Sequence, residues 1–320
     1  MMSTDAQPSP TGPAPLVSIV IPAYNSAALI GATLKSVRAQ TIGDWEAIIV
    51  DDCSKDDLPA VVDGFADARF RLIRHAENGG ASAARNTGIA AARGRFIAFL
   101  DADDLWRPDK LEKQIAAVMA QPDPDMVFCV TRMVITLGGG RNILRPIRGK
   151  RPDERMDEFI FVDAGFCQTS TFLASAALVR NIGGFRLIPI GEDHLFAIDL
   201  CNAGARYLLV DEPLATYANE IRDGRLSRMT GLEDGHVFMT AVRDVLSPRA
   251  MLAYHSRYLG IWELRRSPAR GLALLARAIR ARALSPRHAA LLVIRSFMPA
   301  TLYHKIRAIG LSLRSRPRPI

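Results

Sequence analysis

The first hundred residues alternate between two hydrophobic patterns, which predicts alternating strands and helices. Continuous apolar runs, typical of strands buried on both faces, cover residues 16–22, 47–51, 70–74 and 96–100. Between them, apolar residues recur with helical spacing in residues 28–40, 58–65 and 81–92. This order predicts an α/β fold with a Rossmann-like, mostly parallel, doubly wound sheet flanked by helices, and with ligand-binding loops at the strand carboxyl ends.

The pattern is less regular after residue 100. Helical spacing predicts helices over residues 109–119, 174–182 and 194–202. Residues 126–137 are predicted to form a strand or a strand pair, and residues 207–210 a late strand. Residues 138–157 are rich in Gly, Arg and Pro, which predicts a loop.

Length and composition are those of an ordinary globular protein. The chain has 320 residues, of which 49% are hydrophobic and 23% charged, which excludes a largely disordered chain, a coiled coil and a collagen-like repeat. We expect a disordered lead-in over 1–15, an α/β domain over 16–248 and a basic helical extension over 249–320. No secretion signal is visible at the N-terminus, and no run of 18 uncharged apolar residues predicts a transmembrane helix.

Charge is distributed unevenly along the chain. Residues 249–320 contain 15 Lys and Arg and one acid, Glu263, for a net +14, whereas residues 1–248 carry a net −6. An acidic body joined to a basic extension suggests two separate tasks. The four cysteines, Cys53, Cys129, Cys167 and Cys201, lack metal-type spacing and are interpreted as free thiols in a reducing compartment.

Polar residues of similar kinds follow each of the four predicted strands. They are Pro22 to Asn25, then Asp51, Asp52, Ser54 and Asp56, then Asn78, Gly79 and Gly80, and finally Asp101, Asp103 and Asp104. The carboxyl ends of parallel strands meet at one edge, so several carboxylates should surround one crevice. Carboxylates brought together repel one another unless a cation lies among them, and oxygen ligands suit Mg²⁺ or Mn²⁺.

Each of these features taken alone also has a simpler interpretation. The three aspartates after residue 100 could cap the helix that begins near Pro108. Asp51 and Asp52, like Gly79, could be ordinary turn residues. Arg85, one turn into a helix, could form a surface salt bridge. It is the occurrence of such polar segments after all four predicted strands that favours a binding site.

The combined motifs resemble the family 2 glycosyltransferases, which have the nucleotide-sugar-binding GT-A fold. Five matching segments occur in order over residues 16–220, and they are Val17 to Asn25, Val50 to Asp56, Asn78 to Gly88, Asp101 to Asp104, and Gly191 to Asp193. One departure is Cys53, where the family usually has Gly or Asn. The resemblance implies an inverting, metal-dependent hexosyltransferase that uses a nucleotide-sugar donor, expected to be UDP-linked.

The resemblance also assigns roles to individual residues. The residues it assigns to nucleotide-sugar binding are Pro22, Ala23, Tyr24, Asn25, Asp51, Asp52, Asn78, Gly79, Arg85, Asp101 and Ala102. Tyr24 would stack on or beside the uracil, and Asp51 and Asp52 would hydrogen-bond the base edge. Asp101 would lie near the ribose, and Arg85 near the diphosphate or sugar. Asp103 would bind the metal cofactor, Mn²⁺ or Mg²⁺.

A general base is also expected from the resemblance. One carboxylate of Glu192 and Asp193, with Asp193 favoured, would take the proton of the acceptor hydroxyl. Without the other motifs, these residues would be interpreted as complementing the dipole of the following helix. His194 could ligate a metal or pack in that helix. Residues 217–228 could form a basic loop that closes over the diphosphate, or a solvated charged loop.

The basic extension has competing interpretations. A helical segment over 258–284 could lie on an anionic membrane surface, or pack as a hairpin on the catalytic domain. Nucleic-acid binding is not expected, since interleaved aromatic residues are missing. We therefore expect a cytoplasmic enzyme that is peripheral on the inner face of the membrane. Its expected acceptor is a lipid-linked glycan, in exopolysaccharide or surface-glycan biosynthesis. The alternatives are a non-catalytic nucleotide- or membrane-binding scaffold and a sugar nucleotidyltransferase.

Overall fold

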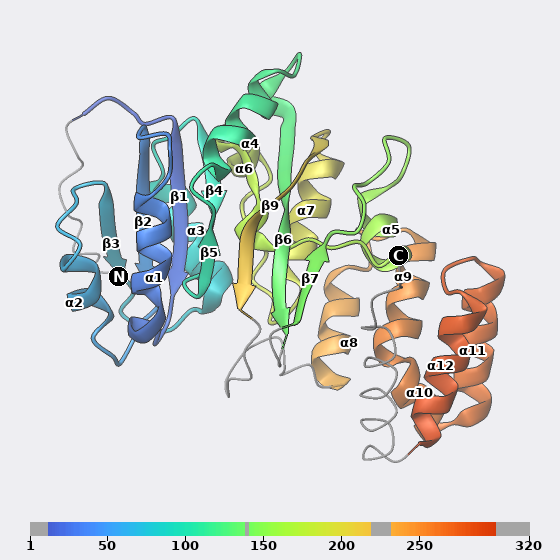
Figure 1. The fold of residues 1–320 in the computed structure, drawn as a ribbon. Coiled ribbons are helices and arrows are strands. Elements are labelled where there is room, and N and C mark those ends of the chain that lie inside the picture. Colours follow the sequence, from blue (N-terminus) through green and yellow to red (C-terminus); the bar gives the residue numbers. More distant parts are fainter. Residues whose placement is uncertain (1–11, 138–140, 219–231, 299–320) are drawn as a thin grey trace, which may run out of the picture. The chain divides into compact units, whose positions relative to one another are not determined.

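The computed structural model describes residues 12–137, 141–218 and 232–298, and Figure 1 shows their fold. Contacts divide the chain into two compact units. The first comprises residues 1–156 and 165–228, and the second comprises residues 157–164 and 229–320. The boundary expected at residue 248 stays a prediction, although the second unit begins earlier in the chain. Residues 1–11 of the expected lead-in and residues 219–228 of the expected basic loop lie outside the described residues.

Within the described residues of the first unit, nine strands form one sheet. Their order is β3-β2-β1-β4-β8-β6-β9-β5, with β7 paired to β6. Their bounds are Val17–Ala23 (β1), Trp45–Asp51 (β2), Phe70–Arg74 (β3), Phe96–Phe99 (β4), Asp104–Trp106 (β5), Val127–Leu137 (β6), Arg141–Arg145 (β7), Leu173–Ser175 (β8) and Arg206–Ala218 (β9). The first four are parallel, β8 runs antiparallel to β4 and β6, and β9 is parallel to β6.

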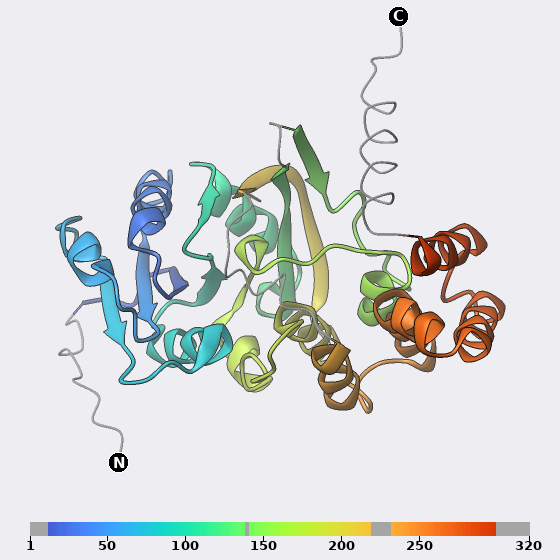
Figure 2. The same cartoon turned by 90° about the horizontal axis from the view of Figure 1, so that it is seen from below.

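Helices cover both faces of this sheet. Their bounds are Ala27–Arg38 (α1), Leu58–Asp63 (α2), Gly80–Ala91 (α3), Lys110–Met119 (α4), Ala176–Asn181 (α6) and Glu192–Asn202 (α7). Figure 2 shows α1 and α2 on one side of the strands and α3, α6 and α7 on the other. On the α3 side the approach to β1 is close, because a Cβ at Gly88 would lie 2.4 Å from Val20 Cγ1. A glycine is therefore required there for the helix to pack.

The sheet topology brings the predicted loops to one edge. Strands β1, β2 and β4 are adjacent and parallel, so the segments that follow them leave the sheet at the same end. After β4 the chain passes through the aspartates and pairs β5 antiparallel with β9 at the far edge of the sheet. Thr33 of α1 supports that crossing by donating hydrogen bonds to the carbonyls of Ala102 and Asp104, each at 2.9 Å.

The α/β fold and the early elements are confirmed, and several later expectations are wrong. The expected loop at 138–157 contains β7 and the start of helix α5, Met156–Phe161. The helix expected from residue 174 begins at Ala176, because β8 occupies the preceding three residues in the sheet. The late strand runs from Arg206 to Ala218, because its pairing with β6 continues past an irregularity near Thr131.

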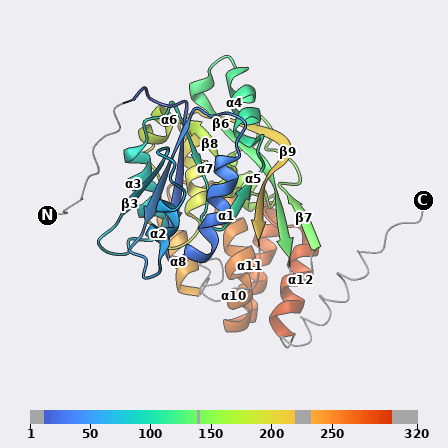
Figure 3. The ribbon, with the colours of Figure 1, turned by 60° about the vertical axis from the view of Figure 1, so that its left-hand side comes forward.

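The second unit is helical in its described residues. After α5, its helices are Leu232–Ala241 (α8), Pro248–Tyr254 (α9), Gly260–Arg266 (α10), Pro268–Arg280 (α11) and Pro286–Phe297 (α12), with a π-helical turn, η4, at His255–Leu259. Figure 3 shows α10, α11 and α12 side by side, and these helices pack on one another. The segment 258–284 is therefore not one continuous helix. None of the described helices has the length and apolar character needed to cross a membrane.

Candidate active site

The acidic loop after β4, Asp101 to Asp104, is held in place by the segment that directly precedes β8. Gln168 donates from Nε2 to Asp101 Oδ2 and to Asp104 Oδ2, both at 3.0 Å. Ser170, in a short 3₁₀ turn (η2, Thr169–Thr171), donates from Oγ to Asp104 Oδ2 at 2.5 Å and accepts the Asp101 N–H at 3.0 Å. Neither Gln168 nor Ser170 is among the site residues predicted from the sequence. The available signal was a run of four polar residues between apolar Cys167 and Phe172.

The buried carboxylate of Asp104 has an unfavourable electrostatic environment. Burial raises its pKa well above the ordinary value, and the charges of Asp101 and Asp103 raise it further, against the hydrogen bonds from Ser170 and Gln168. Its Oδ1 is buried and has no hydrogen-bond partner among the described residues. A cation near this cluster would relieve the repulsion between the carboxylates.

These residues fit a divalent cation of the Mg²⁺ type. No group of three or more His, Cys, Asp or Glu side chains in the described part of the chain is arranged to enclose a metal. Mg²⁺, however, is commonly bound through one or two carboxylates together with substrate phosphates, rather than by an all-protein cage. A loop that offers Asp101 and Asp103 beside the buried Asp104 supplies that kind of donor set.

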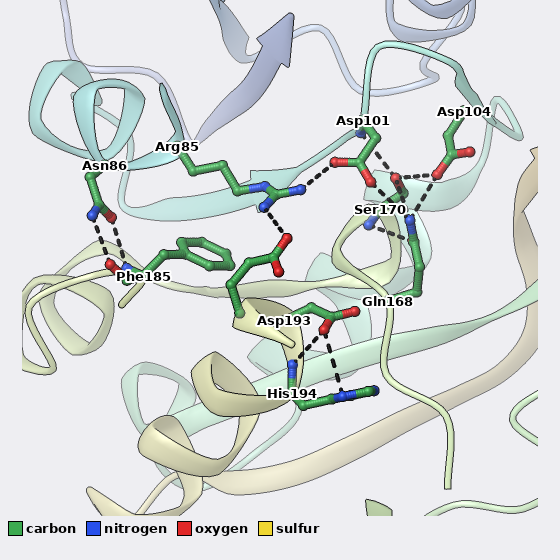
Figure 4. Close-up of polar contacts among 10 residues, drawn as sticks. Arg85, Asn86, Asp101, Asp104, Gln168, Ser170, Phe185, Asp193 and His194 are labelled. Atoms are coloured by element: carbon green, nitrogen blue, oxygen red, sulfur yellow. Dashed lines mark hydrogen bonds and ion pairs between the residues drawn. The ribbon is translucent and has the colours of Figure 1, made fainter. Parts of the chain in front are cut away.

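Arg85 connects the acidic loop with helix α7. From α3, its Nη2 donates to Asp101 Oδ1 at 2.8 Å and its Nη1 to Glu192 Oε1 at 3.1 Å. Figure 4 shows the guanidinium pointing toward Asp101. Burial opposes the charge of Arg85, but the carboxylates of Asp101 and Glu192 outweigh burial and raise its pKa. A charged group is thus held between the two segments for which the family resemblance predicts donor binding and catalysis.

The position of Arg85 is supported by its neighbour in α3. Asn86 donates from Nδ2 to the Phe185 carbonyl at 2.8 Å and accepts the Phe185 N–H at 2.7 Å, as Figure 4 shows. This fixes the Phe185 ring, whose centroid lies 5.1 Å from the Arg85 guanidinium carbon. The distance suits a cation–π contact, which favours one placement of the arginine.

Glu192 and Asp193 form the first turn of α7. The turn begins at Gly191, whose φ of +76° is a left-handed conformation that glycine adopts readily. Burial raises the pKa of Glu192, and the charge of Asp193 adds to that effect, while Arg85 opposes it. Asp193 Oδ1 accepts the His194 N–H at 2.7 Å. The two expected base candidates are therefore adjacent and partly buried, and one of them is engaged by Arg85.

The loops after β1 and β2 brace each other. Asn25 accepts the Lys55 N–H at Oδ1 over 2.8 Å, and its own N–H donates to Ser54 Oγ at 2.9 Å. Asn25 and Cys53 both have left-handed backbones, with φ of 47° and 63°. The left-handed backbone at Cys53 explains why the family usually has Gly or Asn at this position, and Cys53 departs from that preference. Tyr24 is 48% exposed, so its ring is accessible.

The two expected base-contacting carboxylates are engaged within the protein. Asp52 is 3% exposed and accepts the N–H groups of Gly79 at 2.9 Å and Gly80 at 2.7 Å. It also contacts His75 Nδ1 at 2.7 Å. Asp51 is fully buried and accepts the Ser54 N–H at 2.8 Å. Their visible role is to fix the loops that follow β2 and β3, and direct contact with a base stays a prediction.

Sequence comparison finds a family match and curated relatives. The model of "Glycosyl transferase family 2" matches residues 18–183. The "Succinoglycan biosynthesis protein ExoO" of Rhizobium meliloti (strain 1021) is 32% identical over 269 residues, which cover 78% of this chain and 75% of that protein. The "UDP-Glc:alpha-D-GlcNAc-diphosphoundecaprenol beta-1,3-glucosyltransferase WfgD" of Escherichia coli is 45% identical over 104 residues, 32% of this chain and 41% of that protein.

Solved structures share the fold. S. aureus TarS 1-349 in complex with UDP-GlcNAc has a TM-score of 0.63 at 18% identity, over 87% of this chain and 84% of that chain. The mannosyltransferase PcManGT from Pyrobaculum calidifontis, in complex with GDP-Man and Mn²⁺, has a TM-score of 0.55 at 22% identity, over 92% and 83% of the two chains.

Proposed function

The chain belongs to glycosyl transferase family 2 and has the GT-A fold, and on that premise we propose that it transfers one sugar, with inversion, from a nucleotide diphosphate donor to a hydroxyl of a growing glycan. The donor is proposed to be UDP-linked, in keeping with the UDP-Glc and UDP-GlcNAc named for a relative and a structural neighbour. Inversion follows from a single in-line displacement, as the family resemblance implies.

The observation that carries this proposal is the position of Arg85. It links Asp101, which follows a parallel strand, to Glu192 at the start of α7. A transferase needs a positive charge where the leaving diphosphate gains negative charge, and a carboxylate near the acceptor hydroxyl. Arg85, Glu192 and Asp193 bring both requirements to one place.

In the proposed displacement, the acidic loop and Arg85 stabilise the leaving nucleoside diphosphate. The divalent cation, when bound, would be held by Asp103 with Asp101 nearby, and it would stabilise negative charge on the departing nucleoside diphosphate. Arg85 supplies a further fixed positive charge at the same end of the sheet. The hydrogen bonds of Gln168 and Ser170 keep the Asp101 and Asp104 carboxylates in position.

Asp193 is the proposed general base. The acceptor hydroxyl becomes a competent nucleophile only when a positioned carboxylate takes its proton during the attack. Glu192 already accepts a hydrogen bond from Arg85, so a proton taken up by Glu192 would weaken that ion pair. Asp193 is next to it in the first turn of α7. Glu192 is accordingly proposed to position Arg85.

The proposed acceptor is a lipid-linked glycan in exopolysaccharide or surface-glycan assembly. ExoO is named for succinoglycan biosynthesis, and WfgD for transfer to a GlcNAc-diphosphoundecaprenol. The ExoO alignment spans most of both chains, whereas the WfgD alignment spans less than half of either, so the pathway is better supported than the individual acceptor.

A donor screen tests the function. The full chain would be incubated with Mn²⁺ and a panel of UDP- and GDP-sugars, and nucleoside diphosphate release and protection from thermal unfolding would be measured. We expect one donor to stabilise the protein and to be hydrolysed slowly. Binding without release, also in the presence of lipid-linked acceptors, would favour a non-catalytic scaffold. Release of pyrophosphate from UTP and a sugar phosphate would favour a nucleotidyltransferase.

A further inference from the structure

Helix α12 carries an apolar stripe on its exposed side. Leu291, Ile294 and Phe297 follow one another at intervals of three residues, which places them along one side of a helix. They are 54%, 52% and 60% exposed, although all three are large hydrophobic residues. Arg287, four residues before Leu291, is also exposed and belongs to the same side. We name Leu291, Ile294 and Phe297 the α12 stripe.

The opposite side of α12 attaches the helix to its own unit. Ala289 and Ser296 are buried there, and the Ser296 carbonyl accepts a hydrogen bond from Arg265 Nε of α10 at 3.0 Å. A Cβ at Gly260 would lie 4.0 Å from Leu292 Cδ1, which places that leucine against α10. The helix is therefore already packed by a different face, and the stripe is not part of that core.

The helices around the stripe are strongly basic. Residues 260–297 contain eight arginines and one acid, Glu263. That acid lies 3.4 Å from His255 Nε2. The exposed arginines among them are Arg265, Arg266, Arg270, Arg277, Arg280, Arg282, Arg287 and Arg295. An apolar stripe on such a surface suits a partner with an anionic exterior and an apolar interior.

We propose that the α12 stripe and the surrounding arginines dock on the surface of an anionic lipid bilayer. Amphipathic helices bind bilayers by burying an apolar face at the acyl boundary while basic residues meet anionic headgroups. Each Lys or Arg near such a surface adds to the electrostatic attraction. A second copy of the chain fits less well, because it would bring one strongly basic surface against another. The proposal does not depend on the identity of the donor or acceptor.

Vesicle co-sedimentation of the full chain tests the proposal. The vesicles would contain phosphatidylcholine alone or with phosphatidylglycerol, at salt concentrations from 0.1 M to 1 M. The stripe variant would carry Leu291→Gln, Ile294→Gln and Phe297→Gln, and the charge variant Arg277→Gln, Arg280→Gln and Arg287→Gln. A matched control would carry three exposed apolar exchanges in the first unit, Met119→Gln, Leu144→Gln and Ile147→Gln.

We expect the unaltered chain and the control to bind anionic vesicles only, and to be released as the Debye length falls from about 10 Å to about 3 Å. The stripe and charge variants should each bind at least about tenfold more weakly. Equal binding by the stripe variant, or binding indifferent to lipid charge, would overturn the proposal. So would a dimer in light scattering that the stripe variant dissociates. If the stripe variant does not fold, the single exchange Phe297→Gln at the end of α12 gives the same comparison.

Discussion

Arg85 Nη1 donates a hydrogen bond to Glu192 Oε1 over 3.1 Å, although the two residues are 107 positions apart in the chain. The other terminal nitrogen of Arg85 reaches Asp101 at 2.8 Å. Arg85 is only 4% exposed, so its buried charge depends on these two carboxylates for compensation. The start of α7 is thereby tied to the acidic loop after β4.

Replacing Arg85 should therefore impair catalysis more than folding. We expect Arg85→Met to lower the transfer rate by on the order of 10²–10³, since a group that stabilises the leaving diphosphate is lost. Arg85→Lys should recover only part of that rate, because an ammonium group cannot span Asp101 and Glu192 as the planar guanidinium does. Steady-state kinetics would measure both. Arg71→Met, which breaks an ion pair with Glu46 on β2, is the control and should leave the rate unchanged.

The sequence could predict those parts of the site that follow buried strands. Asp101 and Asp103 were found because continuous apolar runs located the strand ends, and parallel pairing brings those ends together. Gln168 and Ser170 were not found, because their position depends on β8 and η2 inserting between β4 and β6. Long-range antiparallel pairing of three-residue strands leaves little periodic signal in a sequence.

The general base can be identified by comparing two neutral isosteres. We expect Asp193→Asn to lower the transfer rate by on the order of 10²–10⁴ while donor affinity stays nearly constant, since the base acts on the acceptor. Glu192→Gln should instead weaken donor binding as well, because it loosens Arg85. Isothermal titration with nucleoside diphosphate and single-turnover kinetics separate the two effects. If Glu192→Gln alone lost the rate at constant donor affinity, the roles of the two residues would be reversed.

Asp103 is expected to link metal and donor binding. Asp103→Ala should abolish transfer and remove the Mn²⁺ dependence of nucleoside diphosphate binding, since the carboxylate that would hold the cation is gone. Titrations with and without Mn²⁺ measure this dependence directly. Asp109→Ala, at the start of α4 in an ion pair with Lys113, is a control of the same type. Normal turnover in Asp103→Ala would exclude the metal assignment.

Lys110 should make stability depend on pH above neutrality. The side chain is fully buried against Trp106, with Nζ 3.9 Å from the ring centroid, and Nζ donates to Gln114. Burial lowers its pKa from 10.5 to about 7, and the neighbouring Cys129 only partly opposes this. Between these two values the unfolded chain binds more protons than the folded chain, so the free energy of unfolding should rise with pH. Below pH 7 Lys110 is charged in both the folded and the unfolded chain. Burial of that charge then lowers the free energy of unfolding by about 5 kcal/mol at most.

Lys110→Met keeps most of the buried stem and removes the amine. It should raise the free energy of unfolding at pH 6 by on the order of 1–4 kcal/mol, as replacement of buried charges by apolar groups often does. The gain should shrink steadily between pH 7, above which the folded chain loses this proton, and pH 10.5, above which the unfolded chain has lost it too. Denaturant unfolding across this range measures the difference between variant and unaltered chain. Lys113→Met, one turn along α4 and half-buried, should not change the slope below pH 10, because ion pairs with Glu212 and Asp109 raise the pKa of Lys113. Parallel pH profiles for Lys110→Met and the unaltered chain would mean that Lys110 keeps its proton in the folded protein.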